Sequence, residues 1–158
     1  MTASPEDLRR VRGRFATGVT VVTAGEDGKA SGLTVSAFAV LSLTPPLALV
    51  CLDRSSRTLA MVSSAGRFGV NILAEGQQDI AERFATKNEE KIAGGPPLRG
   101  ATGVPLLAGA HAALECRVER VVDGGDHAIV VGVVEATRLG EGRPLLFYRG
   151  RYCSLRED

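Results

Sequence analysis

The stretch from residue 53 to residue 58 contains residue types that could bind an anion. It reads Asp-Arg-Ser-Ser-Arg-Thr and lies between an apolar run and an expected helix. Hydroxyl groups, guanidinium groups and the exposed amides of a helix N-terminus together suit a phosphate or another anion. A structural interpretation stays open from the residues alone, in which Ser55 or Ser56 caps the helix and the arginines are solvated.

Thr34 and Ser36 form a second group of polar side chains. They lie in an alternating run over residues 30–41, and the side chains of a strand alternate with a period of two. The alternation predicts one face that carries Thr34, Ser36 and Phe38 and an opposite face that is apolar. We therefore expect the two hydroxyls to point in the same direction.

His127 is the candidate for a direct role in catalysis. It follows a Gly124-Gly125 turn in the stretch Gly-Gly-Asp-His. A lone histidine at the start of a strand is also commonly a surface residue, so the stretch alone leaves both interpretations open. Tyr148 and Tyr152 share the last apolar stretch of the chain, where aromatic side chains would equally mark a subunit interface.

Composition and missing motifs exclude several classes of function. The chain has 158 residues, with 19 Lys and Arg against 18 Asp and Glu and no Trp, so it offers neither a basic surface nor many stacking side chains for nucleic acid. No G-x-G-x-x-G, P-loop or G-x-S-x-G motif occurs. The three cysteines are far apart and form no zinc-binding spacing, so we expect no metal.

The sequence also lacks the signals of membrane insertion or export. No apolar run approaches the roughly 20 residues of a membrane span, and the first residues are acidic and helix-forming rather than typical of a signal peptide. We expect a cytoplasmic protein with no membrane partner.

The elements that must position the polar groups are mainly β-strands. Short loops with Gly indicate hairpins at 27–28 and 124–125, and three short helices do not make the βαβ alternation of a parallel sheet. We expect one domain over residues 1–158, mainly β with peripheral helices, packed as an antiparallel barrel. The expected strands are 19–23, 30–41, 47–52, 68–73, 114–122, 129–134 and 145–155; the expected helices begin near Pro5, at Leu59 and at Gln77, and 87–105 is an expected loop.

Taken in order, seven segments resemble the flavin reductase-like family with the FMN-binding split-barrel fold. These reductases serve two-component flavin monooxygenases. The order and spacing of the segments carry the resemblance, because each is weak alone, and 87–105 is the poorest match. The segments are Phe-Ala-Thr-Gly-Val-Thr-Val-Val-Thr at 15–23, Gly-Leu-Thr-Val-Ser-Ala-Phe at 32–38, Ser-Leu-Thr-Pro-Pro-Leu at 42–47, Asp-Arg-Ser-Ser-Arg-Thr at 53–58, Phe-Gly-Val-Asn-Ile-Leu at 68–73, Ala-Glu-Arg-Phe-Ala at 81–85 and Gly-Asp-His at 125–127.

The resemblance implies a homodimeric split barrel that binds FMN or FAD and reduces it with NADH or NADPH. It also implies roles for individual residues. The isoalloxazine would be held by Thr34, Val35, Ser36 and Ala37; the ribityl chain and phosphate by Asp53, Ser55, Ser56 and Thr58; an apolar wall and a second phosphate contact would come from Phe84 and Lys87; and the nicotinamide would meet His127, with Tyr148 lining the same space.

Three functions remain open at this stage. The first is an NAD(P)H:flavin oxidoreductase that releases reduced flavin to a partner monooxygenase. The second is a split-barrel flavoprotein whose tightly bound flavin acts on another acceptor, such as a quinone, a haem-related pigment or a cobalamin. The third is a non-catalytic flavin-binding module.

Overall fold

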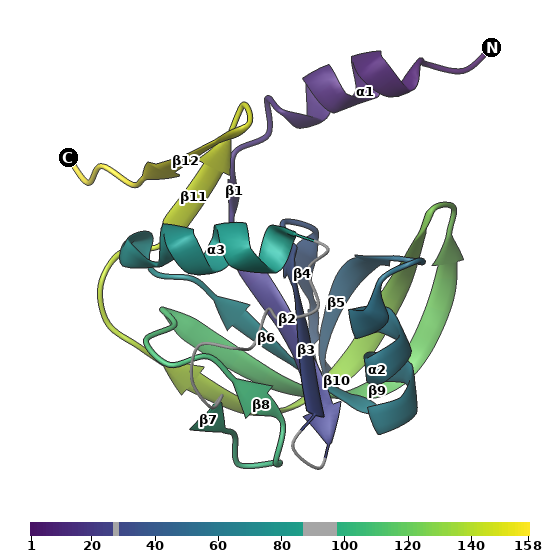
Figure 1. The fold of residues 1–158 in the computed structure, drawn as a ribbon, viewed down its shortest axis with the longest axis vertical. Coiled ribbons are helices and arrows are strands. Elements are labelled where there is room, and N and C mark those ends of the chain that lie inside the picture. Colours follow the sequence, from purple (N-terminus) through teal and green to yellow (C-terminus); the bar gives the residue numbers. More distant parts are fainter. Residues whose placement is uncertain (27–28, 87–97) are drawn as a thin grey trace.

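The computed structural model describes residues 1–26, 29–86 and 98–158 (Figure 1). Antiparallel strands form most of this part of the chain, with three α-helices at the periphery. The elements are α1 (Pro5–Arg12), β1 (Thr17–Gly18), β2 (Thr20–Glu26), β3 (Lys29–Val35), β4 (Phe38–Leu43), β5 (Pro46–Asp53), α2 (Arg57–Ala65), β6 (Arg67–Ile72), the short 3₁₀ helix η1 (Glu75–Gln77), α3 (Gln78–Ala85), β7 (Leu98–Arg99), β8 (Pro105–Leu106), β9 (Ala112–Gly124), β10 (His127–Leu139), β11 (Leu145–Tyr148) and β12 (Arg151–Ser154).

The main sheet has seven strands in the order β3-β2-β6-β9-β10-β5-β4. Its two edge strands, β3 and β4, follow each other in the chain and are joined only by Ser36 and Ala37. The sheet must therefore curl until its two edges approach each other at this link, which is the geometry of a barrel split along one seam. The expected antiparallel split barrel is confirmed.

The expected single strand over residues 30–41 is wrong. The chain leaves one edge of the sheet after Val35 and joins the opposite edge at Phe38, and the Cys51 amide donates to the Ala37 carbonyl at 3.0 Å. The apolar-polar alternation continues through the link, so the pattern alone does not reveal the change of edge.

Two apolar clusters stabilise the fold. The larger cluster fills the curve of the sheet and includes Phe68 of β6 and Val62 of α2. The smaller cluster lies under α3 and includes Phe84. Phe68 is fully buried. Burying a side chain of this kind stabilises the fold by roughly 1.5–3 kcal/mol.

The strands β9 and β10 are each 13 residues long and form a hairpin whose far end is exposed. The turn lies at Gly125-Asp126, one residue later than expected, and Gly125 has a φ of 78°. In Figure 1 this end of the hairpin extends beyond the rest of the sheet. His127 begins β10 directly after the turn.

A second sheet of three strands, β1-β11-β12, lies beside the barrel. The expected single strand over 145–155 is wrong, because the chain turns back at Arg149 and Gly150, whose φ angles are 51° and 78°. Positive φ at both central residues is the geometry of the tight hairpin turns that match strand twist.

The expected first helix is confirmed: Ser4 caps α1 and accepts a hydrogen bond from the Asp7 amide at 3.1 Å. None of its residues is buried, and α1 projects away from the barrel (Figure 1). Its apolar side, defined by Leu8, Val11 and the following Phe15, faces no other part of the described chain; Phe15 is 77% exposed.

Much of the expected loop at 87–105 lies outside the described residues, as does the turn expected at 27–28. Residues 98–106 contain the β7–β8 hairpin, which the buried Glu115 of β9 holds in place. Its carboxylate accepts hydrogen bonds from the Ala101 amide at 2.8 Å and the Thr102 amide at 2.7 Å.

None of the described helices is both long enough and apolar enough to cross a bilayer. Within the same residues, no three His, Cys, Asp or Glu side chains gather as a set of metal ligands.

Candidate functional site

Three separate segments meet at the seam of the barrel. Asp53 at the end of β5 pairs directly with His127 at the start of β10. The link Ser36–Ala37 lies beside the same strand, because the Ala37 carbonyl accepts from the Cys51 amide at 3.0 Å. The fold therefore places the link, the residue 53–58 stretch and the Gly-Asp-His turn at neighbouring strands of the sheet.

The loop between β5 and α2, which we call the Asp53 loop (residues 53–56), is organised by its own side chains. One carboxylate oxygen of Asp53 accepts from the Ser55 amide at 2.7 Å and from the Ser55 hydroxyl at 2.6 Å. Ser56 caps α2, since its hydroxyl oxygen accepts from the Leu59 amide at 3.1 Å. The capping role that the sequence left open is thus confirmed for Ser56.

The N-terminus of α2 opens from this loop with no acidic residue in its first turn. The positive end of the helix dipole is therefore not neutralised by its own side chains. Thr58 is the second residue of α2 and is only 2% exposed. Its hydroxyl is 2.8 Å from that of Ser31 on β3. Thr58 thus ties α2 to β3, a contact that the sequence analysis did not anticipate.

The four residues Thr34 to Ala37 differ in what they can offer a ligand. The Thr34 hydroxyl donates to the Ala81 carbonyl of α3 at 2.7 Å, and Val35 is buried. Ser36 and Ala37 are exposed on the link between the edge strands. Because β3 ends at Val35, the period-two rule that paired the Thr34 and Ser36 hydroxyls does not extend to Ser36.

The imidazole of His127 is partly exposed and is oriented by its neighbour. Nδ1 lies 2.7 Å from a carboxylate oxygen of Asp126. An ionised carboxylate only accepts hydrogen bonds, so this contact places a hydrogen on Nδ1 and leaves Nε2 as the acceptor of a neutral ring. Asp126 was not singled out from the sequence, although it stands directly beside His127.

Arg54 connects the Asp53 loop to the Gly-Asp-His turn. Its Nε donates to the Gly125 carbonyl at 2.7 Å, its guanidinium pairs with Asp123, and its backbone amide donates to the Asp126 carbonyl at 3.1 Å. The hydrogen bond from the Arg54 side chain, helped by the Gly125 amide, holds the pKa of Asp123 below its ordinary value. The guanidinium is thus directed at the turn.

Three of the predicted residues do not join this cluster. Phe84 is buried in the cluster under α3 and packs against Gly32. Tyr148 ends β11 in the second sheet, and in Figure 1 the β11–β12 hairpin lies on the opposite side of the view from the tip of the β9–β10 hairpin. Lys87 lies outside the described residues.

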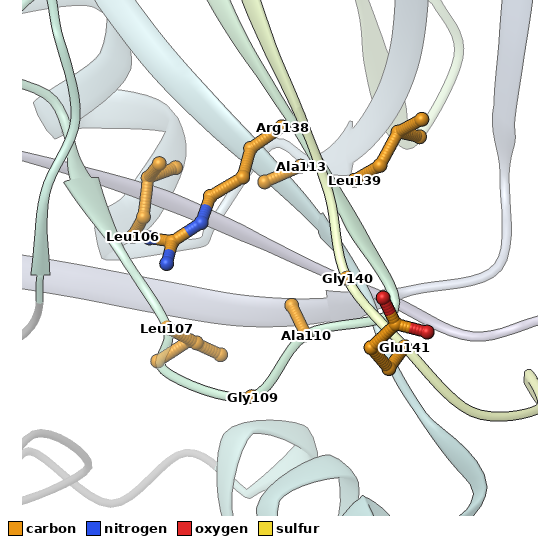
Figure 2. Close-up of a pocket in the computed structure, with 9 residues that line it drawn as sticks. All are labelled: Leu106, Leu107, Gly109, Ala110, Ala113, Arg138, Leu139, Gly140 and Glu141. Carbon is orange, nitrogen blue, oxygen red and sulfur yellow. The ribbon is translucent and has the colours of Figure 1, made fainter.

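A pocket of about 230 Å³ lies at the other end of β10 (Figure 2). Figure 2 shows Arg138 and Glu141 on its two sides, with Leu106 and Leu107 on the β8 side. None of the predicted site residues lines it, so this pocket is separate from the cluster at the seam.

Comparisons with known proteins agree with this arrangement. The chain is 43% identical over 155 residues to the reductase subunit HsaB of a flavin-dependent monooxygenase from Rhodococcus jostii, which covers 98% of this chain and 80% of that protein. It is similar to the NADH:FAD oxidoreductase SgcE6 of Streptomyces globisporus, solved with NAD and FAD fragments, with a TM-score of 0.91, 36% identity and coverage of 100% of this chain and 98% of the other.

The flavin reductase PheA2 superposes with a TM-score of 0.90 at 32% identity over 98% of this chain and all of the other. The model of the family described as "Flavin reductase like domain" matches residues 12–156, which includes every segment at the seam. The chain therefore belongs to the flavin reductase-like domain family.

Proposed function

We propose that this protein is an NAD(P)H:flavin oxidoreductase that supplies reduced FMN or FAD to a flavin-dependent monooxygenase. The observation that carries the proposal is the direct pairing of Asp53 with His127, which sets an anion-binding loop beside an oriented imidazole. The similarity to the monooxygenase reductase subunit HsaB and to the NADH:FAD oxidoreductase SgcE6 supports the same reaction and the same kind of partner.

The residues at the seam fit a flavin by their chemistry. A flavin ring needs a few placed hydrogen-bond donors beside an apolar surface, and its phosphate needs an anion site. The exposed backbone of Ser36 and Ala37, with Thr34 and Val35 behind it, would meet the ring. Ser55, Ser56 and the amides at the start of α2 would hold the ribityl chain and phosphate, with Asp53 and Thr58 shaping the loop.

When bound, the nicotinamide would supply a hydride and the flavin would accept it, so the redox chemistry would come from the two cofactors. The protein's task is to stack the two rings and to exclude water. His127 would contribute a fixed polar contact, because Asp126 holds Nδ1 and leaves Nε2 free of this contact. Phe84 is buried under α3 and Tyr148 lies in the other sheet, so the proposed ring contacts come from the other named residues.

We also infer that the protein forms a homodimer. The apolar side of α1 and the edge strand β4 are both exposed, the latter through Val40, Leu41 and Leu43. A second copy of the chain would remove these surfaces from water, and large exposed apolar patches mark such interfaces. Light scattering should give a dimer mass, and Leu8→Glu combined with Val11→Glu should shift the protein to a monomer. A monomeric parent chain contradicts this part of the proposal.

The decisive test of the function is a steady-state assay with both flavins and both nicotinamides. We expect NADH or NADPH to be oxidised at a rate that saturates with added FMN or FAD. Turnover that does not depend on added flavin would instead identify a tightly bound flavin that serves another acceptor. A protein that neither binds flavin nor oxidises either nicotinamide is not the proposed enzyme.

A further inference from the structure

We propose that Arg54 is a positioning residue, which fixes the His127 imidazole relative to the Asp53 loop through its contacts with Asp123 and Gly125. This inference rests on the proposed function, because it concerns the alignment of a nicotinamide at His127 with a flavin held by that loop. Arg54 itself touches neither ring in this arrangement.

The contacts of Arg54 reach both ends of the turn. Nε donates to the Gly125 carbonyl at 2.7 Å, while one terminal nitrogen, Nη2, pairs with the carboxylate of Asp123. The same carboxylate accepts from the Gly125 amide at 3.2 Å, so the turn is closed around the pair. A guanidinium presents several N–H groups in a rigid plane and can serve two acceptors at once, which a lysine ammonium cannot do with the same geometry.

The turn lies at the exposed end of the β9–β10 hairpin. Residues 119–124 of β9 are exposed, and β5, the neighbour of β10, ends at Asp53 opposite His127. Beyond that point Arg54 contacts the turn through both its side chain and its backbone amide. Exposed hairpin ends open locally at low cost, so loss of the side-chain contacts should loosen the turn that carries His127.

The charge of Arg54 is already matched by Asp123, and this distinguishes positioning from phosphate binding. A cation that held the phosphate would raise flavin affinity, and its removal would raise the flavin Kd. A residue that aligns His127 should leave flavin affinity nearly unchanged and affect the transfer step. Misplacement of a reacting group by about 1 Å can slow a reaction by as much as roughly 100-fold.

The test uses the full chain and the variants Arg54→Ala and Arg54→Lys, with Arg120→Ala as the matched control. Arg120 is an exposed arginine of the same hairpin that pairs with its neighbour Glu119. Flavin Kd is measured by fluorescence titration, and kcat and the KM for NADH by steady-state assay. We expect Arg54→Ala to lower kcat roughly tenfold with a flavin Kd within about twofold of the parent, and Arg54→Lys to behave in the same way.

Asp123→Asn should lower kcat in part, and Asp123→Asn in the Arg54→Ala background should add little, because both changes break one contact. An unchanged kcat in Arg54→Ala, or a flavin Kd that rises as much as kcat falls, overturns the positioning role. The positioning role is also overturned if Arg120→Ala lowers kcat as much as Arg54→Ala does. If the parent protein oxidises no nicotinamide with either flavin, the proposed function fails, whatever the variants do.

Discussion

Asp53 and His127 are direct partners across the β5–β10 ladder, and each is oriented by hydrogen bonds within its own segment. Asp53 accepts from Ser55, and His127 is held through Nδ1 by Asp126. The two segments thus meet as preformed units. Substitutions in one segment or the other should therefore have different effects on flavin binding and on hydride transfer, and both can be measured.

Replacing His127 with alanine should lower turnover more than it weakens flavin binding. The side chain is proposed to contact the nicotinamide, and one placed polar group of this kind contributes roughly ten- to a thousandfold in rate. Stopped-flow rates of flavin reduction and a fluorescence titration of flavin give the two quantities. His111→Ala, which removes the other histidine, is the control and should change neither. Equal losses of rate and affinity would remove His127 from the nicotinamide role.

Replacing Ser56 with alanine should lower the free energy of unfolding by about 1 kcal/mol, because the Leu59 amide loses its capping acceptor. Ser63→Ala is the control, since Ser63 is an exposed residue within the same helix. Urea denaturation of the two variants at neutral pH makes the comparison. Equal stabilities of Ser56→Ala and Ser63→Ala would contradict the capping role.

Replacing Gly32 with alanine should destabilise the protein by roughly 1–3 kcal/mol. A Cβ at this position would lie 2.6 Å from a ring carbon of Phe84, so the ring and α3 would have to move. Gly18→Ala is the control, because a Cβ there meets no atom within 4 Å. Thermal and chemical denaturation give the difference. If Phe84 also borders the flavin, Gly32→Ala should raise the flavin Kd, whereas Gly18→Ala should not.

Glu115 should make the stability of the protein depend on acidic pH. Glu115 is 5% exposed, and burial by itself raises the pKa of its carboxyl group. Hydrogen bonds from Thr102 and Ala101 and the charge of Arg67 outweigh this effect and leave the pKa below the ordinary 4.5. The folded state therefore binds this proton less readily than the unfolded chain. The stabilising contribution is complete above pH 4.5 and is lost as pH falls through the folded pKa.

The variant Glu115→Gln tests this directly. At pH 7 it should cost roughly 1–3 kcal/mol, because the amides of Ala101 and Thr102 lose a charged acceptor. Its stability should then fall less steeply than that of the parent as the pH is lowered below 4.5. Parallel curves of unfolding free energy against pH for the two proteins would show that Glu115 does not carry the effect.

The sequence predicted most elements of the fold because they depend on local patterns. The strand at Leu47–Leu52 and the cap at Ser4 follow from apolar runs and from side chains that bond to nearby amides. The break after Val35 could not be predicted, because it depends on a partner strand far along the chain. The hairpin at Arg149-Gly150 was hidden because arginine rarely adopts a positive φ.

The sequence predicted which segments form the candidate site, but it did not predict the side-chain contacts between them. The Asp53 loop, the link at Ser36 and His127 were singled out, and the fold places them together. Arg54 was interpreted as a solvated or anion-binding residue, whereas it pairs with Asp123 at the end of the β9–β10 hairpin. The hydroxyl of Thr58, which was expected to bind a ligand, also contacts that of Ser31 on β3. Both contacts join segments distant in sequence, which residue spacing does not encode.

The carboxylate of Asp53 already occupies the two Ser55 donors. A phosphorylated ligand that binds through Ser55 must compete with the Asp53 carboxylate for these donors, which lowers the affinity of the loop for the ligand. Such competition shortens the residence time of the ligand. A short residence time suits a protein that releases its product to another protein better than one that retains a permanently bound group.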